Sequence, residues 1–560
     1  MSRYDDLRGK GDDARRLDEL FDRSWRAYLD DHPEVATMIG WPSGHDRWTD
    51  WSVDAVERRR AEAGEAGDVL GSIDPTALDE VQRTSHEMFA VLERDARDLA
   101  RFPSEALLVN QMEGPQSDVP FVLGIMPKDG GDDILARIRA VPDLVDQTIE
   151  LCERGRAAGV TTPRAVLEPV PAQVEAHLGA DSPILSSIAG AADDVLAEAT
   201  ALVEGAVAAA FRRLHEYLES TYLPAARDSI ALTDLPDGTD WYAALVRHHT
   251  TTELSPEEIH RIGLDEVERI SVAMDETQGQ TGFTGDRAAF AEHLRADPRF
   301  YFDSDAALLG FYRDIAKRID PHVVRLFTRL PRLPFGIDPV PADLAPTQPG
   351  AYYMPGSVEL GRAGMFYANT YDLPSRPSWN MESICLHEAV PGHHFQIALA
   401  QETEGLPQFR RQSLSCTAYV EGWGLYCESL GPEMGCYGDP YQRYGALDAE
   451  LLRACRLVLD TGMHALGWTR EQAIDWFIAT SPGPELDLRV EVDRYIVWPG
   501  QALSYKIGEL RIKELRDRWS SRLGSRFDLR AFHDEVLRHG ALPLGMLEDL
   551  VDRWGASVEE

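Results

Sequence analysis

The sequence predicts a mainly α-helical protein with one small β element directly before its most informative motif. Apolar residues recur at three- and four-residue steps through most of the chain, as one buried helical face requires. A proline-rich stretch at 331–350 and the short extended segments after it interrupt this pattern. A chain of 560 residues also exceeds a single ordinary core, so it should divide into two or more domains or lobes.

The first third of the chain shows a succession of helical patterns. In Leu17–Leu29 the apolar residues fall on one face, and similar stripes run through Leu78–Leu99 and the alanine-rich segment Ser187–Tyr222. A further helix should begin at Ser255, because an N-cap serine, a proline in the first turn and Glu258 three residues later form a capping box.

The proline-rich stretch marks a change of structure. It holds six prolines in twenty residues and cannot be a helix. Short extended segments are expected around Ala351–Met354 and Met365–Thr370, and helical patterning returns near Ser383 and continues almost to the C-terminus. These segments form the small β element.

Composition excludes several kinds of partner. The formal charge of −38 argues against nucleic acid, which needs a basic face to displace counterions from phosphates. Residues 1–13 lack the apolar core of a signal peptide, and the sequence contains no run of about 18 apolar residues that could span a membrane.

The six cysteines show no C-x-x-C pair, which favours reduced thiols in a cytoplasmic protein.

Residues 387–396, H-E-A-V-P-G-H-H-F-Q, carry the chemistry. A histidine followed by glutamate opens the zinc-peptidase signature, in which a second histidine one helical turn later is another ligand. Three protein ligands leave a position on zinc open for water, whose pKa then falls from 15.7 to about 7. Glu388 follows the first ligand, His387, and is placed to accept the proton of that water.

The spacing of the histidines departs from the usual signature, because Pro391 stands where the second one would fall. In a straight helix His393 would lie about 9 Å along the axis from His387, and His394 about 10.5 Å. Pro391 has no N–H and Gly392 tolerates unusual dihedrals, so we expect a bulge in this helix. A bulge that absorbs two extra residues would bring His393 to the metal, and one that absorbs three would bring His394. We favour His393.

The third ligand should come from a later helix. In Thr417–Leu430, Glu421 and Glu428 are seven residues apart and share one face, among apolar and aromatic residues that predict burial. A buried carboxylate needs a partner, either a metal or an arginine. We place Glu421 ahead of Glu428 as the ligand, with the other accepting a hydrogen bond from a histidine N–H.

Several segments together resemble the bacterial family labelled domain of unknown function 885. They are the motif at 387–396, E-G-W-G-L-Y-C-E at 421–428, R-Y-I-V-W-P-G-Q-A-L-S-Y-K-I-G at 494–508, F-Y-A-N-T at 366–370, and 252–267. The resemblance implies a bilobed helical fold with a deep cleft, similar to zinc peptidases of the thimet-oligopeptidase and angiotensin-converting-enzyme type. It implies an N-terminal helical lobe over 1–250 and a catalytic lobe over 251–560, integrated into one unit.

The same resemblance implies roles for individual residues. It supports Glu421 as the third ligand and the pair Gly392-His393 as the end of the first motif. The strand Phe366–Thr370 would pair with the substrate backbone, and Tyr495 or Tyr505 would stabilise the oxyanion. Further candidates for contact with the substrate are Tyr367, Asn369, His394, Arg494, Gln501 and Lys506.

The sequence therefore predicts a zinc-dependent hydrolase that cleaves an amide bond in short peptides or peptide-like small molecules. Two alternatives use the same residues differently. A non-haem iron oxygenase would hold its metal with two histidines and a carboxylate and would not need Glu388. A non-catalytic metal-binding or scaffold protein would keep the fold without turnover.

Overall fold

The computed structural model describes residues 3–9, 11–179, 181–342, 345, 348–358, 361–412 and 415–560. The fold is mainly helical, as expected, with one mixed three-stranded sheet. The chain forms two compact units, Met1–Trp241 and Tyr242–Glu560. Helix α14 (Gly238–Thr250) contains the point of division, and the sequence-based boundary lies at its C-terminal end.

The described part of the first unit contains helices and connecting segments. Its α-helices are α1 (Asp13–Asp31), α2 (Pro33–Ile39), α3 (Val53–Glu62), α4 (Glu65–Leu70), α5 (Glu80–Leu99), α6 (Pro115–Ile125), α7 (Gly131–Ala158), α8 (Arg164–Leu167), α9 (Val170–Glu175), α10 (Pro183–Ser187), α11 (Asp193–Leu202), α12 (Ala208–Tyr217) and α13 (Leu223–Ala225). Its 3₁₀ turns are η1 (Asp5–Arg8), η2 (Pro75–Ala77), η3 (Ser104–Leu107), η4 (Ala176–Leu178) and η7 (Leu232–Asp234), and its π turns are η5 (Val203–Val207) and η6 (Leu218–Tyr222).

The predicted helical stripes of this unit are largely confirmed. Helix α1 buries the apolar positions of Leu17–Leu29 except Tyr28, which is 40% exposed. The alanine-rich helix begins at Asp193 rather than Ser187, because Gly190, with φ +97°, interrupts the chain between α10 and α11. Helices α6, α7 and α9 to α12 contribute most of one buried core cluster of the first unit.

The second unit adds the sheet to a further set of helices. Its α-helices are α15 (Pro256–Gln280), α16 (Arg287–Ala296), α17 (Asp305–Leu326), α18 (Met381–Glu388), α19 (His393–Glu402), α20 (Gln408–Arg411), α21 (Thr417–Ser429), α22 (Pro440–His464), α23 (Arg470–Thr480), α24 (Glu485–Val497), α25 (Ser504–Leu523), α26 (Leu529–Leu537) and α27 (Leu544–Glu559). Its strands are β1 (Phe335–Pro339), β2 (Ala351–Met354) and β3 (Gly364–Ala368), and its 3₁₀ turns are η8 (Pro298–Phe300), η10 (Leu373–Ser375), η11 (Ser378–Asn380), η12 (Gln501–Leu503) and η13 (Gly524–Arg526).

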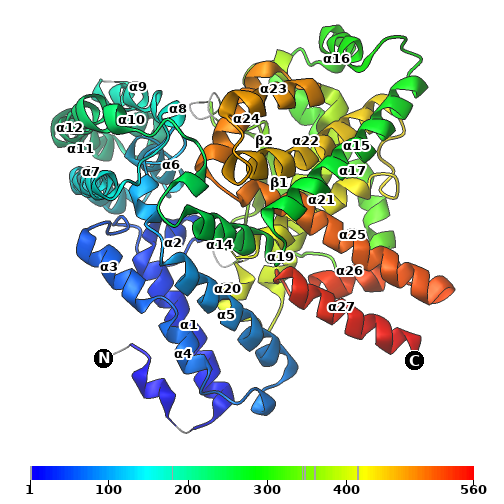
Figure 1. Ribbon diagram of the computed structural model, residues 1–560, viewed down its shortest axis with the longest axis horizontal. Coiled ribbons are helices and arrows are strands. Elements are labelled where there is room, and N and C mark those ends of the chain that lie inside the picture. The colour runs from blue at the N-terminus through cyan, green and yellow to red at the C-terminus, as the bar shows by residue number, and fades with distance from the viewer. Residues whose placement is uncertain are drawn as a thin grey trace. The chain divides into compact units, whose positions relative to one another are not determined.

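Helix α15 starts as the sequence predicts. The Ser255 hydroxyl accepts from Glu258 N at 3.2 Å, and the Glu258 carboxylate accepts from Ser255 N at 2.9 Å. From there α15 runs alongside α22 (Figure 1). Gly263 permits this close packing, since a Cβ there would lie 2.8 Å from side-chain atoms of Leu457 and Val458.

The sheet has the order β1-β3-β2, with β1 parallel and β2 antiparallel to β3. Strand β2 has the expected bounds, whereas β1 was not predicted within the proline-rich stretch. Pro339 ends β1, which is an edge strand that tolerates proline. Because β3 is central and hydrogen bonded on both sides, the expectation that Phe366–Thr370 offers its backbone to a substrate is wrong.

One face of the sheet packs into a core with α17 and α18. The Tyr312 ring of α17 meets the Phe366 ring of β3 edge-on, with centroids 4.9 Å apart. Cys385 of α18 lies in the same buried cluster. This core positions the end of α18, where His387 lies.

Helices α21 and α25 cross at very close range. A Cβ on Gly508 would lie 1.8 Å from the carbonyl oxygen of Ala418, and one on Gly422 would lie 2.5 Å from the Gly508 backbone. The glycines at the crossing therefore let the helix of Glu421 lie directly against the helix of Tyr505.

The structure also bears on the cysteines and on membrane-spanning helices. All six cysteines are buried, and none forms a disulfide. Among the described residues, no helix combines the length and apolarity needed to cross a membrane.

Candidate metal centre

The predicted bulged helix is instead two helices. Helix α18 ends at Glu388 and α19 begins at His393, and the linking residues include a cis Val390–Pro391 peptide. Gly392 is required in this tight return, because a Cβ there would lie 1.8 Å from the carbonyl oxygen of His387. The return brings the rings of His387 and His393 together at 87°, with centroids 4.6 Å apart.

Three ligand-type atoms converge where the two helices meet α21. Nε2 of His387 and Nε2 of His393 each lie 3.5 Å from Oε2 of Glu421. These three residues offer ligand atoms that all lie within 4.8 Å of one another. Two ligands with bonds of about 2 Å to a tetrahedral zinc would be about 3.4 Å apart, so the spacing fits such an ion.

Glu428 orients the first histidine. Its Oε1 accepts a hydrogen bond from Nδ1 of His387 at 2.8 Å, and its other oxygen accepts from the hydroxyl of Ser383. A proton on Nδ1 leaves the lone pair of Nε2 directed toward Glu421 and His393. Glu428 thus has the role expected for whichever glutamate does not bind the metal, because it accepts a hydrogen bond from a histidine N–H. Nδ1 of His393 is buried without a hydrogen-bond partner among the described residues.

The electrostatics of the group favour a bound positive charge. Burial lowers the pKa of His387, but the carboxylates of Glu421 and Glu428 outweigh it and raise that pKa to about 10. Burial raises the pKa of Glu421, but His387 and His393 hold it well below its usual range. A divalent cation satisfies the same demand for positive charge.

Two residues of α21 that sequence reasoning missed shape the site. A Cβ on Gly424 would lie 2.8 Å from both Cε1 and Nε2 of His387, so glycine leaves room for that imidazole. The Trp423 indole N–H donates to the carbonyl of Pro391 at 2.8 Å and secures the return between α18 and α19. The signal was present in the motif E-G-W-G, whose second glycine is Gly424.

His394 lies outside the group, so the structure brings together the histidine pair favoured from sequence. Its Nδ1 shares a hydrogen bond of 2.9 Å with the hydroxyl of Tyr353 on β2. Its ring packs on Phe335 of β1, and burial lowers its pKa to about 4. His394 therefore attaches α19 to the sheet as a neutral imidazole.

Glu388 offers an uncommitted carboxylate next to His387. It is half-buried, and no described residue forms a hydrogen bond or ion pair with it. Its negative charge contributes to raising the pKa of both His387 and Tyr312. A free carboxylate in this position can accept a proton from a nearby water.

The two candidate tyrosines differ in what their hydroxyls contact. Tyr495 is buried, donates to Glu491 at 2.5 Å and accepts from Nε of Arg456 at 3.1 Å. Tyr505 is half-buried beneath the Arg456 guanidinium, 4.6 Å from its ring centroid, and its hydroxyl has no partner among the described residues. Only Tyr505 therefore has a hydroxyl free to bind a substrate.

Two arginines of α22 connect these tyrosines to the candidate metal centre. Arg456 follows Arg453 by three residues on α22, so the two side chains lie on neighbouring turns of one face. Arg453 approaches Oε1 of Glu428 at 3.7 Å. One face of α22 therefore carries both the arginine over Tyr505 and the arginine that approaches the carboxylate orienting His387.

Two side chains that were expected to contact the substrate instead form hydrogen bonds or ion pairs within the protein. The Asn369 amide donates to the carbonyls of Ala345, Gln348 and Pro349. Lys506 is buried between the carboxylates of Glu266, Glu450 and Glu509, at 2.6 to 2.8 Å. Neither side chain is directed to a substrate, because its hydrogen-bonding capacity is already used.

The other three candidates are partly exposed. Tyr367 of β3 packs across the sheet on Tyr352, with ring centroids 5.2 Å apart. Arg494 donates to the amide oxygen of Gln501 at 2.8 Å and lies over Trp498. These residues are accessible without being part of the metal-binding group.

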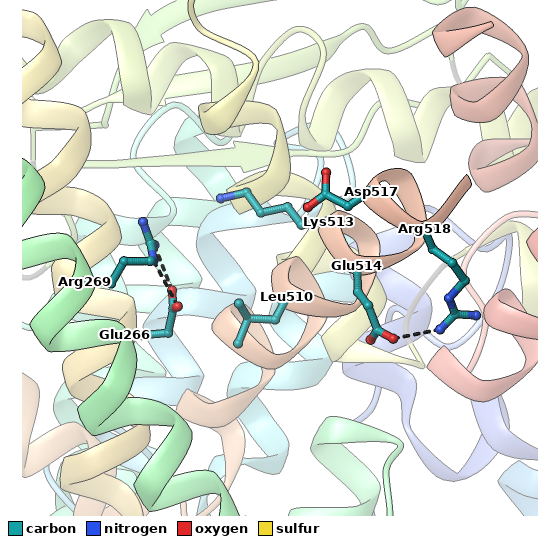
Figure 2. Close-up of a pocket in the computed structure, with 7 residues that line it drawn as sticks. All are labelled: Glu266, Arg269, Leu510, Lys513, Glu514, Asp517 and Arg518. Carbon is teal, nitrogen blue, oxygen red and sulfur yellow. Dashed lines mark hydrogen bonds and ion pairs between the residues drawn. The ribbon is translucent and has the colours of Figure 1, made fainter. Parts of the chain in front are cut away.

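Two pockets lie outside the centre of this group. One is a pocket of about 680 Å³ lined by α15 and α25. Its lining residues, drawn in Figure 2, carry charges of both signs and include none of the three candidate ligands. A second cavity of about 120 Å³ is lined by Glu428 together with Glu450, Glu509 and Lys513. It is large enough for a few water molecules beside the carboxylate that orients His387.

Comparisons with known proteins agree with this fold. The chain belongs to the family described as bacterial protein of unknown function (DUF885), whose model matches residues 33–551. The crystal structure of "the putative lipoprotein from Colwellia psychrerythraea" is 28% identical, with a TM-score of 0.90 over 97% of this chain and 100% of that one. A structure of "a putative lipoprotein of unknown function from Shewanella oneidensis" shares the fold at 18% identity, with a TM-score of 0.72 over 96% of this chain and 98% of that one. No curated protein matches the sequence.

Proposed function

We propose that this member of the family is a zinc-dependent hydrolase that cleaves an amide bond in short peptides or peptide-like small molecules. One observation carries the proposal. His387, His393 and Glu421 present three ligand atoms at a spacing that suits tetrahedral zinc, beside the uncommitted carboxylate of Glu388.

The residues around the group have distinct chemical tasks. Zinc, when held by the three ligands, supplies a Lewis acid that lowers the pKa of water and polarises a carbonyl. Glu388 accepts the proton that the attacking water loses and delivers it to the departing amine as the C–N bond breaks. The Tyr505 hydroxyl donates a hydrogen bond to the oxygen on which negative charge develops.

Tyr495 supports this arrangement without contacting the substrate. Its proton is committed to Glu491, and together they hold Arg456 above the ring of Tyr505. An adjacent guanidinium favours the charge that the Tyr505 hydroxyl has to stabilise. We therefore assign hydrogen bonding to the oxyanion to Tyr505 and positioning to Tyr495.

The substrate main chain has an available edge of the sheet. Strand β3 is paired on both sides, whereas no described strand pairs with the outer edge of β2. Tyr353 of β2 contacts His394, which directly follows His393. We assign substrate backbone binding to this edge, where an extended peptide could add as a further strand.

We propose a cytoplasmic location, because the six buried cysteines form no disulfide, as in a protein of a reducing compartment. The two similar structures belong to proteins named as lipoproteins, and that description applies to them. Recovery of this protein in the membrane fraction after cell lysis would overturn the proposed location.

The first experiment measures metal content and turnover together. Purified wild type should carry about one zinc per chain, His393→Ala should lose it, and His394→Ala should retain it. Glu388→Gln should keep the zinc and lower kcat on a cleavable peptide by about 10²- to 10⁴-fold, the contribution of a general base.

Each alternative has its own outcome. Bound iron, with oxidation that survives Glu388→Gln, would establish the oxygenase. Bound metal with no turnover of any library peptide would favour the scaffold, and no metal after zinc reconstitution would overturn the hydrolase.

A further inference from the structure

We infer that Arg376 binds a free carboxylate at the C-terminal end of the substrate. This inference rests on the proposed function and narrows its substrate class to peptides or acylated amino acids that end in a free acid. Arg376 lies in the turn that connects the 3₁₀ turns η10 and η11, between β3 and α18.

The guanidinium of Arg376 is anchored by the backbone but is not neutralised. Its Nε donates to the carbonyl of Asn369 at 3.2 Å, and Nη1 donates to that of Ser375 at 3.4 Å. Among the described residues no carboxylate forms an ion pair with it, and Nη2 has no hydrogen-bond partner. A partly exposed, unpaired arginine is notable in a chain with 94 acidic and 56 basic residues.

Buried Asn369 explains how the arginine is held. Its backbone carbonyl accepts a hydrogen bond from Nε of Arg376, while its side-chain oxygen accepts one from Tyr371 N at 2.9 Å. Its amide donates at the same time to the carbonyls of Ala345, Gln348 and Pro349. The donor is therefore preorganised before a ligand arrives, which reduces the entropic cost of binding.

Arg376 and the proposed base flank one buried cluster: Leu373, three residues before Arg376, packs against it, and Ala389, next to Glu388, belongs to it. Tyr312, packed between β3 and α18, is near both charges: Glu388 raises its pKa and Arg376 lowers it, in addition to the larger effect of burial. Arg376 follows the end of β3, and Glu388 ends α18, which packs against the sheet. A carboxylate on Arg376 would therefore place the preceding amide bond toward Glu388.

The surroundings of Arg376 also suggest what precedes the carboxylate. Asp487 of α24 is near both Arg376 and Asp372, which act on its pKa in opposite directions after burial. Next to these acids in the chain are Leu486 and Tyr371, whose side chains are 71% and 54% exposed. Exposed apolar side chains on the segments of Asp372 and Asp487 suit a terminal residue with an apolar side chain.

The test compares binding of the tripeptide Ala-Ala-Leu as free acid and as C-terminal amide. Calorimetric titration into Glu388→Gln loaded with zinc avoids turnover. We expect the acid to bind about 10- to 100-fold more tightly than the amide, as a charge-assisted hydrogen bond provides. Introducing Arg376→Gln into the Glu388→Gln protein should abolish this difference in affinity between acid and amide. Arg313→Gln, which alters an exposed arginine on α17, should preserve it as the matched control.

The results separate this inference from the proposed function. If acid and amide bind equally, if neither binds, or if the preference survives Arg376→Gln, the inference is overturned even where Glu388-dependent hydrolysis is found. A preference that depends on Arg376 in a protein that neither holds zinc nor hydrolyses peptides supports the carboxylate site alone. Should Arg376→Gln fail to fold, Arg376→Lys must keep a preference for the acid, and its loss there overturns the inference.

Discussion

At the scale of single residues, the surroundings of His387 decide whether it can be a ligand. Glu428 holds the proton on Nδ1, and Gly424 leaves the space that the ring occupies. Neither residue would itself bind the metal. The metal affinity that we propose for the centre would therefore depend on side chains that lie behind the three candidate ligands.

Gly424→Ala tests the space around this imidazole. The added Cβ would lie 2.8 Å from Nε2 of His387, so the ring must shift and zinc affinity should fall by about 10- to 100-fold, as for other losses of ligand support. Competition with a chromogenic chelator measures this change.

The matched control is Gly279→Ala on α15, where a Cβ meets nothing within 4 Å. That substitution should leave zinc affinity unchanged and raise the free energy of unfolding by about 0.5–1 kcal/mol. Native zinc affinity in Gly424→Ala would show that the ring tolerates the methyl group.

At the scale of elements, the site depends on how closely helices approach one another. Helix α21 carries Glu421 and Glu428, and its crossing with α25 brings Tyr505 toward the same region. Glycines at the crossing permit a separation that any larger residue would prevent. A change at this crossing should therefore affect both stability and the proposed hydrolysis.

Gly508→Ala tests the crossing directly. Its Cβ would lie 1.8 Å from the Ala418 carbonyl oxygen, and forced separation of the helices should lower the free energy of unfolding by about 1–3 kcal/mol. Urea denaturation followed by circular dichroism measures the loss. Gly310→Ala on α17, where a Cβ meets nothing within 4 Å, should stabilise the protein slightly. Equal stability of the two variants would contradict close packing at Gly508.

At the scale of the whole molecule, excess negative charge coexists with acidic groups buried inside the second unit. The net charge is −38, yet Asp460 lies fully buried on α22. It accepts from the Tyr242 hydroxyl at 2.6 Å and from Gly500 N at 3.0 Å. This carboxyl group joins α14, α22 and the turn before α25.

Asp460 should make stability depend on pH. Burial outweighs its hydrogen bonds and raises its pKa to about 7, above about 3.9 for the unfolded chain. Because the pKa is raised in the folded state, folded Asp460 keeps its proton at pH values where the unfolded chain has lost it. The resulting contribution to the free energy of unfolding is complete below pH 3.9 and is lost as pH rises through 7. The loss amounts to about 4 kcal/mol at most.

Comparison with Asp460→Asn isolates this contribution from other titrating groups. The amide keeps an oxygen to accept from Tyr242 and Gly500 but cannot ionise. Urea denaturation at intervals from pH 4 to 8 should show the wild type losing stability relative to the variant as pH rises. A constant difference across this range would contradict the raised pKa.

The sequence by itself determined what local patterns encode. Helical periodicity, the capping box at Ser255 and the extended segment Ala351–Met354 depend on neighbours within a few residues, and all appear in the structure. The shared face of Glu421 and Glu428 follows from helix geometry alone. The spacing of the motif also selected the histidine pair that the structure brings together.

Only the tertiary structure decided features that depend on distant partners. The return between α18 and α19 is held by Trp423, and β3 became central because β1 formed in the proline-rich stretch. The internal roles of Asn369 and Lys506 follow from carbonyls and carboxylates on other segments, which periodicity does not reveal. The free hydroxyl of Tyr505 and the unpaired guanidinium of Arg376 likewise depend on which neighbours pack beside them, and a one-dimensional pattern does not contain that information.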